Sequence, residues 1–182
     1  KGEENRYIFG FEESYGYLSG AYVRDKDAVN ASMLICEMAA YYRTQGISLL
    51  EARENMYKKY GMFYQTLYSF TFEGESGMNK MDEIMTTLRN NPPTAIAGVP
   101  VVKFDDYKAS TSKDIASGKV TELTLPKSNV LAFFLEGGSK VIVRPSGTEP
   151  KIKIYLTAKQ PTRAEAEALE KKLHDEFSKN FQ

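Results

Sequence analysis

The chain has 182 residues, with 24 basic and 24 acidic side chains and a formal net charge of zero. This balance gives no electrostatic basis for binding nucleic acid or an anionic membrane surface. The single cysteine, Cys36, excludes an internal disulfide, and the apolar runs are too short for a signal peptide or a membrane span. We therefore expect a cytoplasmic protein of one or two domains, with no nucleic-acid and no membrane partner.

The first part of the chain carries one weak strand pattern and two helix patterns. Residues 7–11 alternate weakly and predict a strand that leads into a loop. A helix is expected over residues 27–44, and its side chains are apolar on most sides, which predicts substantial burial. The sequence Ser48-Leu-Leu-Glu51 is a capping box that opens a second helix, and Gly61 ends it.

The second part alternates between strand and helix patterns. An amphipathic helix is expected from Met78 to Leu88, and Asn90-Asn-Pro-Pro93 stops it. Another capping box, Thr162-Arg-Ala-Glu165, opens the last helix, where His174 has a structural or solvated role beside the buried stripe. The expected strands cover residues 63–72, 99–104, 130–135, 140–143 and 151–156, with a hairpin at 137–138 and a polar connection over 105–118.

The order of these elements predicts two domains. Residues 1–61 look like an α/β remnant, the end of a mixed α/β domain whose earlier strands are missing. The start at Lys1 rather than at methionine suggests the interior of a longer protein. Residues 62–182 predict an α+β domain with an antiparallel sheet and helices on one face. Cys36 lies in the apolar helix and is expected to be a small core residue.

The segment Arg144-Pro-Ser-Gly-Thr-Glu-Pro150 gathers the groups that a bound phosphate monoester needs. Arg144 offers a charged planar fork that can bind two phosphate oxygens. Ser146 and Thr148 offer hydroxyl donors, and Gly147 lets successive backbone N–H groups converge on an anion. Because the segment lies between two expected strands, it predicts a stiff phosphate-binding loop rather than an ordinary turn.

A second cluster lies near the start of the chain, within Phe9-Gly-Phe-Glu-Glu-Ser-Tyr-Gly16. Glu12 and Ser14 are two residues apart, so in an extended segment they project to the same side. A carboxylate and a hydroxyl placed in this way can hold two neighbouring hydroxyl groups of a sugar ring. Arg24 and Lys26 add two cations just before the expected helix.

These motifs, in this order, resemble the C-terminal part of the α-D-phosphohexomutases, and within that superfamily they are most similar to the phosphoglucomutases. The resemblance rests on Glu12-Glu-Ser14, on Arg24-Asp-Lys26 and on Arg144-Pro-Ser-Gly-Thr148. It implies a magnesium-dependent isomerase of carbohydrate metabolism. That enzyme would interconvert glucose 1-phosphate and glucose 6-phosphate through the intermediate and activator glucose 1,6-bisphosphate. It also implies the end of a third domain followed by a fourth domain.

On the sugar side, the resemblance implies that Glu12, Ser14 and Arg24 hold the hexose. Lys26 resembles the family's lysine near the reacting oxygen, where it would stabilise charge or assist proton transfer. A second interpretation of Arg24 is an ion pair with Asp27 at the start of the helix.

On the phosphate side, the resemblance implies that Arg144, Ser146, Gly147 and Thr148 bind the phosphate that is not being transferred. Lys153, on the next strand, matches a basic position of phosphoglucomutases and would add positive charge. It alternates with isoleucine along the strand, so a solvent-facing structural position is an equal alternative.

Two motifs of the family are absent from the chain: the phosphoserine loop and the Asp-x-Asp-x-Asp metal loop. Asp25 and Asp27 are only two acids at alternate positions, and Asp105 and Asp106 are adjacent, so neither pair makes a hard-cation cage. We expect no metal ligands here, with Mg²⁺ held by the missing first two domains of the same polypeptide. The chain alone is expected to be inactive, since no nucleophile–base pair can be assembled.

Other functions stay open on the sequence. A phosphomannomutase or a phosphopentomutase of the same superfamily would carry similar motifs. A non-catalytic phosphosugar-binding module is the rival class of protein. Nucleotide binding fits poorly, because neither Gly-x-x-x-x-Gly-Lys-Ser/Thr nor Gly-x-Gly-x-x-Gly is present.

Overall fold

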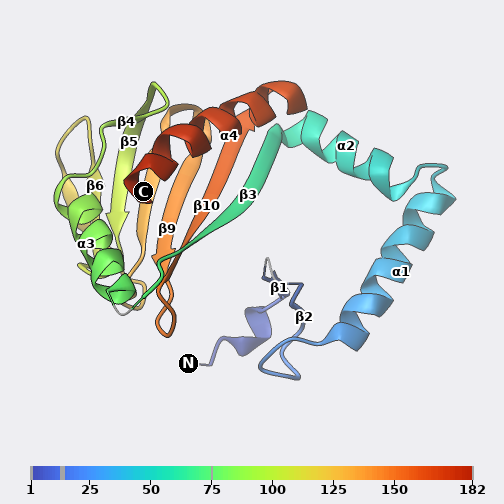
Figure 1. Cartoon of the computed structure of the whole chain (residues 1–182). Coiled ribbons are helices and arrows are strands. Elements are labelled where there is room, and N and C mark those ends of the chain that lie inside the picture. Colours follow the sequence, from blue (N-terminus) through green and yellow to red (C-terminus); the bar gives the residue numbers. More distant parts are fainter. Residues whose placement is uncertain (1, 13–14, 75, 182) are drawn as a thin grey trace. The chain divides into compact units, whose positions relative to one another are not determined.

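The computed structural model describes residues 2–12, 15–74 and 76–181, and the chain divides into two compact units (Figure 1). The first unit is Lys1–Lys59 and the second is Tyr60–Gln182. Helix α2 (Leu49–Tyr60) and strand β3 (Met62–Thr71) meet at this boundary. Gly61 stands between them with a φ of +93°, which confirms that this glycine ends the second helix.

The first unit contains a small hairpin and two helices. Strands β1 (Phe9–Phe11) and β2 (Tyr17–Ser19) pair antiparallel, with Gly10 opposite Leu18. The capping box at the start of α2 is confirmed, because the Glu51 carboxylate accepts the Ser48 N–H at 2.7 Å while Ser48 Oγ accepts the Glu51 N–H at 3.2 Å. The elements before α2 are η1 (Glu4–Arg6), β1 (Phe9–Phe11), β2 (Tyr17–Ser19) and α1 (Ala28–Thr44).

Helix α1 forms where the sequence predicts it, but the predicted burial is wrong. None of its residues is buried, and Val29 and Met33 are 82% and 64% exposed. Cys36 is likewise exposed rather than a core residue. The physical reason is that the described part of this unit has a sheet of only two strands with three residues each. Such a sheet cannot cover a helix that is apolar on most sides.

The second unit is built on an eight-stranded antiparallel sheet. Seven strands follow the order β3-β10-β9-β8-β5-β6-β7, and β4 pairs with β5. The predicted α+β class is confirmed. The strands after β3 are β4 (Ala95–Ile96), β5 (Val99–Asp106), β6 (Thr111–Asp114), β7 (Val120–Glu122), β8 (Leu131–Leu135), β9 (Lys140–Pro145) and β10 (Lys151–Gln160), and the helices are α3 (Gly77–Asn90), η2 (Glu136–Gly138), α4 (Arg163–Phe177) and η3 (Ser178–Phe181).

One face of this sheet and its helices enclose the hydrophobic core. Strand β3 alternates strictly between more and less exposed residues, as expected for a sheet with one covered face. Residues Met81 and Met85 of α3 and Leu173 and Phe177 of α4 belong to a single buried cluster with the sheet. Both helices therefore pack on the same face, as the sequence predicts (Figure 1).

The polar segment over residues 105–118, predicted to be a connection, contains strand β6. Asp105 is 2% exposed, and its carboxylate accepts the Ser112 hydroxyl at 2.6 Å. Its other oxygen accepts the Lys103 ammonium at 3.0 Å. The Ser112 hydrogen bond joins β6 to the adjacent strand β5, and the Lys103 contact neutralises the Asp105 charge, so polar side chains support a strand that an apolar pattern would not reveal.

Helix α4 is fixed to the edge strand β3 by a buried carboxylate. Glu170 is 5% exposed and accepts hydroxyl protons from Thr66 at 2.6 Å and from Tyr68 at 2.9 Å. Burial, followed by the hydrogen bond to Glu170, raises the pKa of the Tyr68 hydroxyl. His174 stacks on the Tyr68 ring with centroids 3.9 Å apart, which is the structural role expected of it.

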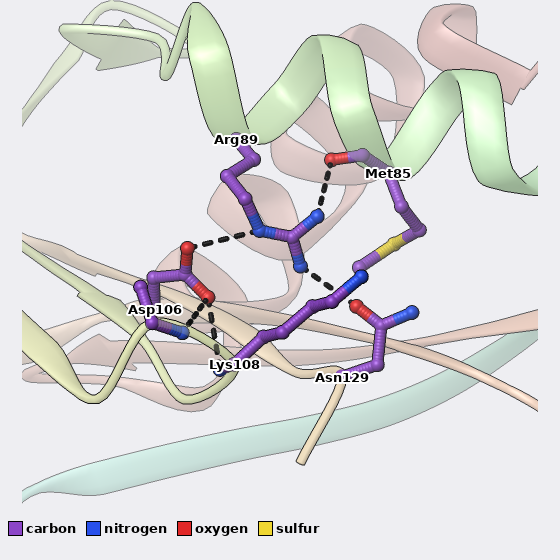
Figure 2. A network of polar contacts seen from close by, with 6 residues as sticks. Met85, Arg89, Asp106, Lys108 and Asn129 are labelled. Atoms are coloured by element: carbon purple, nitrogen blue, oxygen red, sulfur yellow. Dashed lines mark hydrogen bonds and ion pairs between the residues drawn. The ribbon is translucent and has the colours of Figure 1, made fainter. Parts of the chain in front are cut away.

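A partly buried ion pair, in which the Asp106 carboxylate is 5% exposed, links the end of α3 to the sheet (Figure 2). Arg89 Nε donates to Asp106 Oδ2 at 2.9 Å, and Arg89 Nη2 donates to Asn129 Oδ1 at 2.7 Å. The second Asp106 oxygen accepts the backbone N–H groups of Lys108 and Ala109 at 3.0 and 3.2 Å. The pair thus connects the helix, the turn after β5 and the segment that enters β8.

Replacing Arg89 with alanine is expected to destabilise the second unit by about 3 kcal/mol, because it leaves the Asp106 carboxylate buried without its cation. Denaturant unfolding measures this change. Arg163→Ala is the matched control, since Arg163 and its partner Glu167 are 42% and 47% exposed and such pairs contribute less than about 1 kcal/mol. Equal losses in the two variants would contradict the structural role of the partly buried pair.

Candidate functional site

The phosphate-loop candidate lies between β9 and β10, at one end of the sheet of the second unit (Figure 1). Arg144 on β9 is directly opposite Lys153 on β10 in the antiparallel register. Side chains of directly opposite residues project from the same face of a sheet. The register therefore brings the two cations together, and within residues 2–12, 15–74 and 76–181 neither of them forms an ion pair.

Within the loop, Ser146 organises the backbone. Its Oγ accepts the N–H groups of Thr148 at 3.4 Å and Glu149 at 3.2 Å, while its own N–H donates to the Lys151 carbonyl at 2.7 Å. Its hydroxyl proton is still available to a ligand oxygen, because both of these side-chain contacts use the oxygen as acceptor.

Gly147 lies at the exposed tip of the loop. It does not adopt a positive φ, and a Cβ built on it would meet no atom within 4 Å. Its contribution is therefore open access to the backbone rather than an unusual conformation. The carboxylate of Glu149, one residue beyond Thr148, is held 3.1 Å from the Lys151 ammonium, which reduces its repulsion of an anion.

The sugar-loop candidate lies in the first unit, at the turn of the β1–β2 hairpin. The backbone N–H of Glu12 donates to the Gly16 carbonyl at 2.8 Å and closes the turn. The Glu12 side chain is 54% exposed, with one oxygen 3.5 Å from the Lys26 ammonium. Ser14, the other predicted sugar-binding residue of this turn, lies outside the described residues.

Lys26 is held between two carboxylates. Its Nζ is 3.0 Å from Asp25 and 3.5 Å from Glu12, and its aliphatic stem lies against Gly16, where a Cβ would collide with it. Asp25, and to a lesser extent Glu12, raises the pKa of the Lys26 ammonium, while Lys26 lowers the pKa of Asp25. Lys26 is therefore a stable cation, which favours charge stabilisation over service as a base.

The residues Glu12, Arg24 and Lys26 line one hollow of about 350 Å³ in the first unit. Asp27 is the N-cap of α1, and its carboxylate accepts the Asn30 N–H at 3.0 Å and the Tyr22 hydroxyl at 2.6 Å. Within the described residues it forms no ion pair with Arg24. This geometry favours a ligand-facing position for Arg24 over the alternative of a helix-start ion pair.

Tyr7 and Asp25 also line this hollow, although neither is among the predicted sugar-binding residues. Tyr7 precedes the motif and enters the site through its hydroxyl, which donates to the Leu18 carbonyl at 3.1 Å. No sequence pattern marks Tyr7, because its place in the site depends on a spatial contact: a Cβ on Gly10 would collide with the Tyr7 hydroxyl.

Over residues 2–12, 15–74 and 76–181, no group of three or more His, Cys, Asp or Glu side chains could hold a metal ion. In the same part of the chain, no helix has the length and apolarity needed to cross a membrane.

Two sequence models of one protein family match this chain. Residues 1–60 match "Phosphoglucomutase/phosphomannomutase, alpha/beta/alpha domain III", and residues 95–175 match "Phosphoglucomutase/phosphomannomutase, C-terminal domain". The phosphoglucomutase of Staphylococcus epidermidis RP62A is 40% identical over 154 residues, which is 85% of this chain and 28% of that protein. The phosphoglucomutase of Staphylococcus aureus RF122 is 42% identical over 159 residues, or 87% of this chain and 29% of that protein.

A solved structure shares the fold: the open form of the exocytosis-sensitive phosphoprotein pp63/parafusin, a phosphoglucomutase from Paramecium. Its TM-score is 0.60 at 20% identity, and the match covers 95% of this chain and 31% of that one. Fold and motif order together define a chain of phosphohexomutase type. It belongs to the phosphoglucomutase/phosphomannomutase family, which confirms the resemblance that the motifs predicted. The chain spans less than a third of the length of the Staphylococcus relatives.

Proposed function

We propose that this chain supplies the substrate-binding loops of a phosphoglucomutase that interconverts glucose 1-phosphate and glucose 6-phosphate. The observation that carries the proposal is the cross-strand pair of Arg144 and Lys153 beside the Ser146 turn. Two cations, a hydroxyl donor and an open glycine backbone suit a dianionic phosphate monoester. The relatives at 40% and 42% identity are themselves phosphoglucomutases.

In this proposal, Arg144, Ser146, Gly147, Thr148 and Lys153 bind the phosphate that is not being transferred. Glu12, Ser14 and Arg24 bind the sugar hydroxyl groups in the first unit. Lys26 stabilises negative charge near the reacting oxygen, and its contacts with Asp25 and Glu12 keep its ammonium group protonated.

The reacting groups of the whole enzyme belong, in this proposal, to other parts of a longer polypeptide. The acidic residues described here do not fit Mg²⁺, which prefers several oxygen ligands in near-octahedral geometry. We propose that Mg²⁺ is bound elsewhere in that polypeptide and that glucose 1,6-bisphosphate is the intermediate. The uncovered apolar surface of α1 supports such a neighbour, because a surface of this kind is stable when another segment covers it.

Glu12→Gln tests the division of roles between the two loops. It removes the charged acceptor for a sugar hydroxyl, so we expect affinity for glucose 6-phosphate to fall about tenfold, with affinity for inorganic phosphate nearly unchanged. Titration calorimetry measures both affinities, and Glu37→Gln on the exposed face of α1 is the control. Equal losses for the two ligands would contradict separate sugar and phosphate loops.

The same titration distinguishes glucose from the alternatives. A phosphomannomutase would bind mannose 6-phosphate at least as tightly as glucose 6-phosphate, and a phosphopentomutase would favour ribose 5-phosphate. A non-catalytic module would show binding without turnover even when joined to the rest of its polypeptide.

A further inference from the structure

We propose that Gly77, the first residue of α3, is a positioning residue for the phosphate loop. It leaves the space in which Pro150, the last residue of that loop, packs beside the backbone of Phe72. The inference rests on the proposed function of the Arg144 loop as a phosphate clamp. Gly77 itself has no side chain with which to contact a ligand, so it acts only through the loop.

The need for glycine at this position is steric. An ideal Cβ on Gly77 would stand 2.5 Å from the Phe72 carbonyl oxygen and 3.0 Å from Pro150 Cβ. The first of these atoms is backbone and cannot turn aside as a flexible side chain can. Gly77 is not among the residues with positive φ, so its conformation is open to alanine, which has the higher helix propensity. Any loss on substitution therefore reports the close contact.

Backbone hydrogen bonds connect the contact at Gly77 to the rest of the loop. The Phe72 N–H donates to the Pro150 carbonyl at 2.8 Å, extending the ladder in which Thr71 pairs with Lys151. The Lys151 carbonyl in turn accepts the Ser146 N–H at 2.7 Å. The start of α3 and the β9–β10 loop lie at the same end of the sheet (Figure 1). A side chain at position 77 would push Pro150, and with it the Ser146 turn, away from the sheet.

Such a displacement matters because a bidentate guanidinium contact depends on alignment. Arg144 is anchored in β9, whereas Ser146 and Thr148 lie in the part of the loop that Pro150 closes. Moving the closed end would separate the hydroxyl donors from the cations. The expected consequence is weaker phosphate binding with all ligand-contacting residues intact.

The test compares Gly77→Ala with Gly98→Ala and Arg144→Ala by titration with inorganic phosphate and by thermal unfolding. Gly98 is the matched control, because it lies in the β4–β5 turn with a φ of +76° and open space around it. Alanine there strains the backbone without touching the loop. We expect Gly77→Ala to weaken phosphate binding about tenfold, and Gly98→Ala to lower the melting temperature while changing affinity less than about twofold.

A further arm uses the double variant Gly77→Ala/Arg144→Ala, in which the losses should not add, because both act on one clamp. If Gly77→Ala binds phosphate as the unaltered chain does while Arg144→Ala binds it weakly, the positioning role is overturned and the proposed function stands. If the unaltered chain and Arg144→Ala bind phosphate equally, the proposed function itself fails. If Gly77→Ala does not fold, the variant Pro150→Ala tests the positioning role instead. Severalfold weaker phosphate binding by Pro150→Ala supports the proposal, and unchanged phosphate binding overturns it.

Discussion

The chain by itself is expected to show no conversion of glucose 1-phosphate to glucose 6-phosphate. Phosphoryl transfer needs an in-line nucleophile and groups that neutralise the developing charge. The hydroxyl oxygen of Ser146 accepts backbone N–H groups and, within the described residues, contacts no side-chain base. The described acidic residues form no cluster that could hold a metal ion. What remains is binding and positioning, which cannot start the reaction.

A coupled assay with Mg²⁺ and catalytic glucose 1,6-bisphosphate measures this directly, on the chain and on a longer polypeptide that contains it together with the phosphoserine and Asp-x-Asp-x-Asp loops of the family. We expect turnover only in the longer protein, and its loss on Arg144→Ala. Turnover by the short chain that disappears on Ser146→Ala or Ser14→Ala would show that one of these serines is the nucleophile.

Arg144→Ala is expected to reduce the free energy of phosphate binding by about 2 kcal/mol, close to a thirtyfold loss of affinity, because it removes a charge-assisted bidentate contact. Arg144→Lys keeps the charge but loses the planar fork, so its affinity for phosphate should lie between those of the unaltered chain and Arg144→Ala. Calorimetric titration with glucose 6-phosphate and with inorganic phosphate gives both values.

The control for this prediction is Arg163→Ala, which removes the same side chain from an exposed position on α4. It should leave both affinities unaltered. If Arg144→Ala and Arg163→Ala behave alike, phosphate binding depends on overall charge and not on the loop.

Local patterns predicted the elements whose contacts are local. The capping box of α4 forms between Thr162 and Glu165, three residues apart, and both of its hydrogen bonds are present. The Gly137-Gly138 hairpin is confirmed by the antiparallel pairing of β8 with β9, and both glycines have positive φ. The loop between β9 and β10 forms where the sequence predicts it, because its residues are consecutive, and its binding of phosphate stays a prediction.

Features that depend on distant segments could not be predicted. Burial of α1 was expected from its apolar side chains, but burial depends on what covers a helix and not on the helix alone. Strand β6 depends on the pairing of Ser112 with Asp105. The tight contact at Gly77 involves Pro150, so a single glycine at the start of a helix carried no local signal.

In the candidate site, too, the residue types can be read from the sequence, whereas their spatial neighbours cannot. The sequence pattern at Lys153 fits both a ligand-facing and a structural position, and the β9–β10 register places it opposite Arg144. For Arg24, the contacts of the Asp27 carboxylate with Asn30 and Tyr22 disfavour the ion-pair alternative, and sugar binding stays a prediction. In both cases the residue type can be interpreted from the sequence, while the residue that lies beside it can be identified only from the fold.

The loop from Arg144 to Pro150 is expected to bind the phosphate of a sugar phosphate. The most direct measurement is a titration of the isotopically labelled chain with glucose 6-phosphate and, separately, with glucose. Amide chemical shifts report the binding. Glucose 6-phosphate should shift the amides of Ser146, Gly147 and Thr148 in the unaltered chain and leave them unmoved in Arg144→Ala. Shifts of equal size with glucose, or shifts that persist in Arg144→Ala, would contradict the claim.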